Sequence, residues 1–266
     1  MEDVAETKSD KHKNWANPNS IFRDGYSFKG FLISCDANKE KLAVRDSYKI
    51  LNEYFEKLSG QEIDEEVKEM DDLILKKLKG NDTETPDSKV DKRKNQKFYQ
   101  IKVNARGVTF IKIEDNLFSE DFDMETMISK IFEDVIESKS KLSRSICRMI
   151  PVEVGCLASM NNFKSYIKDL ISKHFNSQEE SKTWSMAYKC RNNNKFSKDQ
   201  FLNIILELIP SNYRQLTYNG DITLFVDITQ HLMCLGVYRL YNKFNKFSFE
   251  TSLNKVNKEG LTERED

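Results

Sequence analysis

The segment TWSMAYKCR, residues 183–191, decides how the second half of the chain folds. Mainly apolar side chains occupy its even-numbered positions, from Trp184 to Cys190, and such an alternation with a period of two predicts a β-strand. The odd-numbered positions then share the opposite face. We expect the even face to pack into a core, while Lys189 and Arg191 project from the other face at the end of the strand.

The residues before this strand predict one more strand and a helix. Residues 146–150 form an apolar run that we expect to be a short strand, and Pro151 is expected to stop it because proline cannot donate a hydrogen bond to a sheet. Residues 160–171 place apolar side chains at helical spacing, so they predict a helix with one buried face.

The residues after this strand predict a further helix and two more strands. Ser197 and Gln200 have the spacing of a capping box, which indicates that a helix begins there. The apolar run 222–240 is too long for one strand and predicts two consecutive strands with a turn near 229–231. Together, residues 142–249 predict an α/β unit.

The first half predicts a smaller α+β unit over residues 26–118, so the chain as a whole belongs to the α+β class. Its expected elements are a strand over 28–33 that ends near Cys35, a helix over 44–58, a helix over 63–74 with an acidic outer face, and a hairpin of 98–103 and 108–113 around a turn at 104–107. An amphipathic helix within 119–141 connects the two units. Residues 1–25, 80–97 and 250–266 are expected to be a flexible leader, a disordered insertion and a flexible tail.

Charge is distributed unevenly between the two halves. Residues 1–140 carry 24 Lys/Arg against 30 Asp/Glu, a net charge of −6, whereas residues 141–249 carry 15 against 8, a net charge of +7. This asymmetry is typical of a polyanion-binding unit fused to a part that does not bind polyanions, although a chance fluctuation would give the same numbers.

Motifs of common catalytic sites are missing from the sequence. Nine glycines form neither a dinucleotide-binding fingerprint nor a P-loop, and no nucleophile elbow or HExxH pattern occurs. Five scattered cysteines and three histidines predict reduced thiols in an intracellular protein and no metal site, and no apolar run is long enough to span a membrane. We therefore expect no catalytic site, cofactor or metal. An enzyme whose carboxylate site leaves a weak trace remains the alternative.

The strongest binding signal is the cluster of cations and amides at the end of the strand 183–191. Its candidate residues are Lys189, Arg191, Asn192, Asn193 and Lys195. Arginine and lysine suit phosphate, and asparagine can pair with base edges or 2′-hydroxyl groups. A basic loop that only keeps the fold soluble is the alternative.

Further cations could extend this site if the fold brings them together. They are Arg144, Arg148, Lys164, Lys168, Arg239 and Lys243. Arg148 could instead pair with a partly buried carboxylate such as Asp227. Lys246 also follows the last strand, and the interleaved Phe244 and Phe247 are expected to lie in the core rather than to stack on bases.

These residues resemble the THUMP domain, and more narrowly the eukaryotic THUMP proteins that serve tRNA acetylation. The matching segments are RMIP (148–151) followed by Cys156, WSMAYKCRNN (184–193), and LFVDI (224–228) followed by CLGV (234–237) and Tyr241. The segment KGFLISC (29–35) is similar to the first strand of the ferredoxin-like domain that precedes THUMP in these proteins. The resemblance covers residues 26–249. The insertion 80–97 and the Val-Glu-Val run after Pro151 depart from the pattern.

The resemblance implies a ferredoxin-like domain followed by a THUMP domain that together bind tRNA, commonly at the acceptor stem and its single-stranded 3′ end. Lys189 and Arg191 match the strand end that faces RNA in the family. The lack of a fused catalytic domain implies the stand-alone adaptor branch. That branch helps an RNA cytidine acetyltransferase, which carries acetyl-CoA and ATP, to form N4-acetylcytidine in serine and leucine tRNAs.

Three expectations concern the surroundings of such an adaptor. We expect it in the nucleus or nucleolus rather than the cytoplasm, and the acidic residues 61–79 are a candidate docking surface for the acetyltransferase. The alternatives are a tRNA-modifying enzyme of the methyltransferase or thiolation type, and a protein scaffold without RNA affinity.

Overall fold

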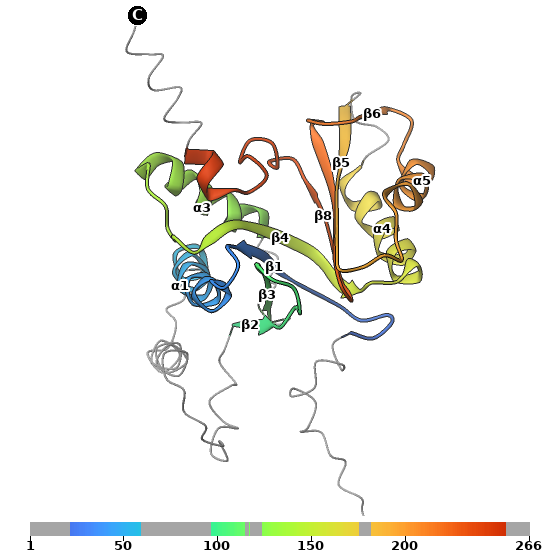
Figure 1. Ribbon diagram of the computed structural model, residues 1–266. Coiled ribbons are helices and arrows are strands. Elements are labelled where there is room, and N and C mark those ends of the chain that lie inside the picture. The colour runs from blue at the N-terminus through green and yellow to red at the C-terminus, as the bar shows by residue number, and fades with distance from the viewer. Residues whose placement is uncertain (1–21, 60–96, 115–116, 118–123, 176–181, 254–266) are drawn as a thin grey trace, which may run out of the picture.

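The computed structural model describes residues 22–59, 97–114, 117, 124–175 and 182–253, and its strands form one eight-stranded sheet (Figure 1). The strand order is β2-β3-β1-β4-β8-β7-β5-β6. The elements are β1 (Ser27–Cys35), α1 (Glu40–Ser59), β2 (Phe98–Ile101), β3 (Val108–Ile113), α3 (Met124–Ser138), β4 (Ile146–Leu157), α4 (Met160–His174), β5 (Lys182–Arg191), α5 (Lys198–Leu208), β6 (Tyr213–Leu216), β7 (Ile222–Thr229) and β8 (Leu232–Tyr238). The mixed α and β composition is confirmed.

Most predicted elements are present where local patterns placed them. The hairpin is β2 and β3, which pair antiparallel from Phe98 opposite Ile113. The helix start at Ser197 is confirmed, because its backbone N–H donates to the Gln200 side chain at 3.0 Å. The apolar run 222–240 folds into β7 and β8 and turns at Gln230, whose φ of 54° is left-handed.

The predicted stop at Pro151 is wrong, since β4 continues through it to Leu157. Pro151 lies opposite Phe31 of β1, and its carbonyl accepts a hydrogen bond from the Tyr238 hydroxyl on the β8 side. The backbone of Pro151 therefore faces away from β1. Pairing with β8 begins only at Val154, so proline removes no donor that the ladder uses.

Strand β6 was missed by the sequence analysis. It is a four-residue edge strand after Pro210, and it pairs in parallel with β5. A strand of this length shows too few alternations to be recognised from its own residues.

Two pairs of helices cover different parts of the sheet. Helices α1 and α3 lie at one end, whereas α4 and α5 cover β5 at the other (Figure 1). Trp184 and Met186 of β5 pack into the core beneath α4 and α5, together with Phe163 and Phe201. The opposite face of β5 carries no helix among the described elements, and the candidate site lies there.

Several expectations concern residues outside the described ranges. They are most of the leader, the helix at 63–74, the docking surface at 61–79, nearly all of the insertion 80–97, and most of the tail. None of the described helices is long and apolar enough to cross a membrane.

Candidate nucleic-acid interface

A cavity of about 370 Å³ lies on the open face of β5. Its floor comes from β5 and β7, and its opposite wall comes from β1 and β4. The loops 217–219 and 241–246 contribute the remaining side. The predicted alternation places Lys189 and Arg191 on this face, because the even-numbered residues of β5 are used by the core under α4 and α5.

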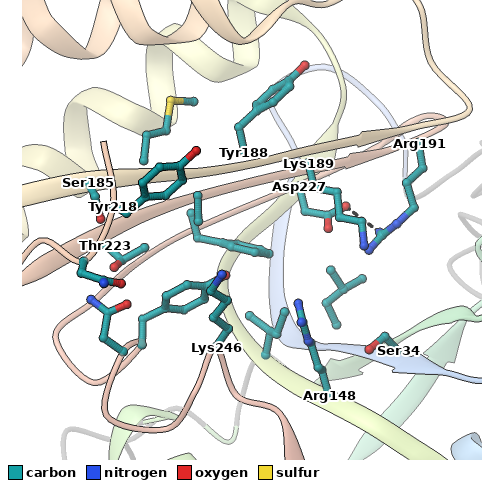
Figure 2. Close-up of a pocket in the computed structure, with 18 of the residues that line it drawn as sticks. Ser34, Arg148, Ser185, Tyr188, Lys189, Arg191, Tyr218, Thr223, Asp227 and Lys246 are labelled. Carbon is teal, nitrogen blue, oxygen red and sulfur yellow. Dashed lines mark hydrogen bonds and ion pairs between the residues drawn. The ribbon is translucent and has the colours of Figure 1, made fainter. Parts of the chain in front are cut away.

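Four cations and one carboxylate line the cavity. The cations are Arg148 from β4, Lys189 and Arg191 from β5, and Lys246 from the loop after β8, and the carboxylate is Asp227 of β7. Figure 2 shows Arg148 reaching from β4 toward the side chains of β5 and β7. The excess of positive charge in a concave space is suited to an anion such as phosphate.

The buried carboxylate of Asp227 is already engaged by Arg191. Arg191 Nη1 donates to Asp227 Oδ1 at 2.9 Å (Figure 2). The same Nη1 donates to Thr229 Oγ1 at 3.1 Å, and the Thr229 hydroxyl donates to the same carboxylate at 3.0 Å. Burial raises the pKa of Asp227, although Arg191 opposes this effect. The suggested pairing of Arg148 with Asp227 is therefore wrong, since Arg191 takes that position.

Arg148 and Lys189 remain available to a ligand. Among the described residues, no carboxylate lies within ion-pair distance of either side chain. Burial lowers the pKa of Lys189, and repulsion from Arg191 and Arg148 lowers it further, while Asp227 opposes the shift. A bound anion would relieve this repulsion, so the cavity gains stability when it is occupied.

The three candidate residues that follow β5, namely Asn192, Asn193 and Lys195, have different surroundings. Asn193 is committed to the turn, because its Nδ2 donates to the Gln230 carbonyl and its Oδ1 accepts from the Lys195 backbone, both at 2.8 Å. Asn192 and Lys195 are exposed and are not among the residues that line the cavity, and Asn192 has a left-handed φ of 51°.

The remaining candidate cations lie apart from the cavity. Lys164 and Lys168 are exposed on α4, across the sheet, and Arg144 is exposed ahead of β4. Arg239 Nη2 donates to the His174 carbonyl at 3.3 Å, and Lys243 lies 3.3 Å from Glu133.

Loops contribute cavity residues that the site prediction left out. They are Lys246, Tyr218, Asn219 and Asn242, together with Ser34 at the end of β1. The Asn219-Gly220 pair signals a turn in the sequence, but no local pattern indicates what that turn faces. The prediction that Phe244 and Phe247 are core residues is confirmed, since both are fully buried.

No family model matches the chain. THUMP domain-containing protein 1 of Mus musculus is 28% identical over 236 residues, which cover 84% of this chain and 63% of that protein. The protein named tRNA acetyltransferase TAN1 of Saccharomyces cerevisiae is 23% identical over 210 residues, which cover 73% of this chain and 71% of that protein.

Likeness to solved structures is low. The crystal structure of PH1313 from Pyrococcus horikoshii gives a TM-score of 0.38 at 10% identity, over 79% of this chain and 54% of that one. The relationship of this chain to known proteins therefore rests on its sequence relatives. The chain spans less than two thirds of the length of the mouse protein. The chain is homologous to THUMP domain-containing protein 1 and to the yeast protein.

Proposed function

We propose that the chain is a non-catalytic adaptor that binds tRNA and presents it to an RNA cytidine acetyltransferase for N4-acetylcytidine formation. The observation that carries the proposal is the convergence of Arg148, Lys189, Arg191 and Lys246 on one cavity whose single described carboxylate is already paired. The name of the yeast relative, which joins tRNA with acetyl transfer, supports the choice of RNA as the anion.

The lining of the cavity supports an unpaired nucleotide as the part of the RNA that enters it. Tyr218 is exposed, so its aromatic ring can stack on a base, and Asn219 offers an amide to a base edge. The amide nitrogen of Asn242, by contrast, already donates to the Gly220 carbonyl at 2.9 Å. The cations would hold the phosphates. This combination suits a single-stranded end better than the interior of a duplex, whose bases are already paired.

A ferredoxin-like domain followed by a THUMP domain, the order that the family resemblance implies, is part of the proposal. Elements β1 to β4, with α1 and α3 between them, follow the β-α-β-β-α-β order of a ferredoxin-like domain, and they form the β2-β3-β1-β4 part of the sheet. Residues 142–249 would then be the THUMP domain. Strand β4 serves both, because it pairs with β1 and, from Val154 onward, with β8.

The chemistry of the cavity supports binding rather than catalysis. Its described lining includes neither histidine nor cysteine, and Asp227 is held by Arg191 and Thr229. The acetyltransferase would supply acetyl-CoA and ATP, serine and leucine tRNAs would be the substrates, and the nucleus or nucleolus would be the location. The yeast relative's name favours a catalytic role, which incubation of the chain alone with tRNA and labelled acetyl-CoA would test.

The decisive experiment measures binding of the purified chain to total tRNA across a salt series. The test variant is Arg148→Ala/Lys189→Ala, which removes two cavity cations and leaves the Arg191–Asp227 pair intact. The matched control is Lys164→Ala/Lys168→Ala, which removes the same charge from α4. We expect the test variant to bind about 10-fold more weakly and the slope of log affinity against log salt to become smaller by roughly 1.5.

The control variant is expected to bind like the wild type. Equal losses of tRNA affinity in both variants would mean that the RNA is bound by the overall positive charge of the protein and not by the cavity. A wild-type protein that fails to bind tRNA at low salt would overturn the proposed function.

A further inference from the structure

The loop after β8 contains three consecutive residues in the left-handed backbone region. The φ angles are 48° for Asn245, 63° for Lys246 and 53° for Phe247. Asparagine tolerates this region, but side chains such as lysine and phenylalanine crowd their own backbone there. Three such residues in succession are energetically costly, and backbones of this kind persist where the surrounding structure holds them and are concentrated at functional sites.

A cluster of aromatic rings holds the loop in this conformation. Phe244, Phe247 and Phe249 are fully buried around Phe132 of α3, with ring centroids 5.4, 5.9 and 4.9 Å from that ring. The backbone is tied as well, because the N–H of Met149 in β4 donates to the Phe247 carbonyl at 3.1 Å. The loop is therefore fixed on both sides of Lys246.

The side chain of Lys246 is not needed for this anchoring. It is exposed and lines the cavity, and no ion pair or side-chain hydrogen bond joins it to another described residue. Its backbone N–H donates to the Tyr241 carbonyl at 2.7 Å, which any residue could do. Figure 2 shows its side chain on the same side of the cavity as Arg148. For stability alone, glycine would suit this position better.

We propose that Lys246 is an RNA-contacting residue, and that the left-handed turn exists to bring its ammonium group to a phosphate bound beside Arg148 and Lys189. The proposal rests on the proposed function of the cavity. It assigns a loop residue to the phosphate site, in addition to the cations of β4 and β5. The backbone strain is the cost of placing a cation at that point.

Substitution by glycine separates the strain from the charge. Lys246→Gly relieves the backbone and removes the cation, so we expect its melting temperature to rise by about 2 °C while its affinity for tRNA falls about 5-fold at moderate salt. Lys246→Ala removes the cation and keeps the strain, so its affinity should fall equally without a rise in melting temperature. Asn245→Gly is the matched control, because it changes the neighbouring left-handed residue and should leave the affinity unchanged.

The outcomes distinguish this proposal from the proposed function. Wild-type affinity in Lys246→Gly, together with a loss in Arg148→Ala/Lys189→Ala, would overturn the role of Lys246 and leave the cavity as the RNA site. An equal loss of affinity in Asn245→Gly would show that the shape of the loop matters and the ammonium group does not. Absence of tRNA binding by the wild type would overturn both proposals.

Discussion

The two faces of strand β5 use adjacent residues for opposite purposes. On the covered face, Trp184 and Met186 are buried beneath α4 and α5. The rings of Phe163 and Phe201 pack edge to face there, with their centroids 4.5 Å apart. On the open face, Lys189 and Arg191 stand beside other cations in a cavity. Neighbours in the sequence therefore have different surroundings. A mutation in the covered core should mainly affect stability, whereas removal of an unpaired cation from the open face should mainly affect RNA binding.

The largest expected effect is on the covered face. Trp184 is almost fully buried, so Trp184→Ala should destabilise the fold by about 3–5 kcal/mol through the loss of buried surface and the cavity left behind. Urea denaturation followed by circular dichroism measures this. Protein that remains folded should still bind tRNA like the wild type.

An aromatic residue on the open side provides the control. Tyr218 is 77% exposed, and Tyr218→Ala should change stability by no more than about 0.5 kcal/mol. Similar destabilisation by both variants would show that the two faces are not separated as described.

The second-largest expected change in stability concerns Glu153 of β4, whose side chain contacts α4 and β8. Its Oε2 lies 2.7 Å from Lys173 Nζ and 2.8 Å from His174 Nε2, and its Oε1 accepts from the Val237 N–H at 3.0 Å. Burial by itself would raise the pKa of Glu153. The hydrogen bond and charge of His174 outweigh this effect, together with hydrogen bonds from the Lys173 side chain and the Val237 backbone, and the pKa is lowered to about 2. The depressed pKa means that Glu153 stabilises the fold when it is ionised.

This stabilisation should depend on pH with a definite sign. It is complete above the ordinary carboxyl pKa of about 4.5 and is lost as pH falls toward about 2. Glu153→Gln should therefore be less stable than the wild type by about 3 kcal/mol at neutral pH, and the difference should shrink in acid. Urea midpoints at pH values near 7 and 3 test this, and a difference that does not change between them would contradict it.

A smaller effect is expected from Asp227 on the open face. Asp227→Asn keeps the shape of the side chain but leaves Arg191 without its anion, so we expect a loss of about 2 kcal/mol in stability, less than for a fully buried pair because Arg191 is partly exposed. The cavity also gains one net positive charge. Affinity for tRNA should accordingly rise about 3-fold at low salt, which a filter-binding titration measures.

The direction of the change in binding is the informative result. A lower affinity in folded Asp227→Asn would mean that Asp227 orients Arg191 for the RNA, and that the open face is organised by more than its net charge.

The smallest effect should come from Arg144, four residues before Arg148. Arg144 is exposed and lies outside the cavity, so Arg144→Ala should change tRNA affinity by less than about 2-fold and stability by less than about 0.5 kcal/mol. Arg148→Ala is the matched comparison, with the same charge removed inside the cavity. Equal losses of tRNA affinity in the two variants would contradict the prediction that a cation inside the cavity contributes more to binding than one outside it.

Sequence patterns predicted the elements well because most of the described strands and helices carry their own periodicity. The alternation in β5 also identified its open face and two of the cavity cations. Local patterns failed where pairing is decided at a distance. Pro151 could not be placed inside a strand without knowing that its backbone faces away from β1, and β6 depends on its parallel pairing with β5.

The site could be predicted only in part, since a cavity is formed by segments that are distant in the chain. Lys246 and Asn219 reach it through loops whose direction is set by tertiary packing. The net negative charge of the first half is also not spread evenly along it. Residues 22–59 and 97–114, the described residues of the first unit before Leu117 and α3, carry 11 Lys/Arg against 7 Asp/Glu, a net charge of +4.

Strand β4 has a mechanical consequence. Its 12 residues pair with β1 and, toward their end, with β8, and Figure 1 shows the strand running from beside α1 and α3 to the start of α4. A rotation of one half against the other would have to break the hydrogen bonds of this shared strand. We therefore expect the two parts of the sheet that β4 joins to move as one rigid body. A partner held near α1 and α3 would stand at a fixed distance from whatever the cavity binds.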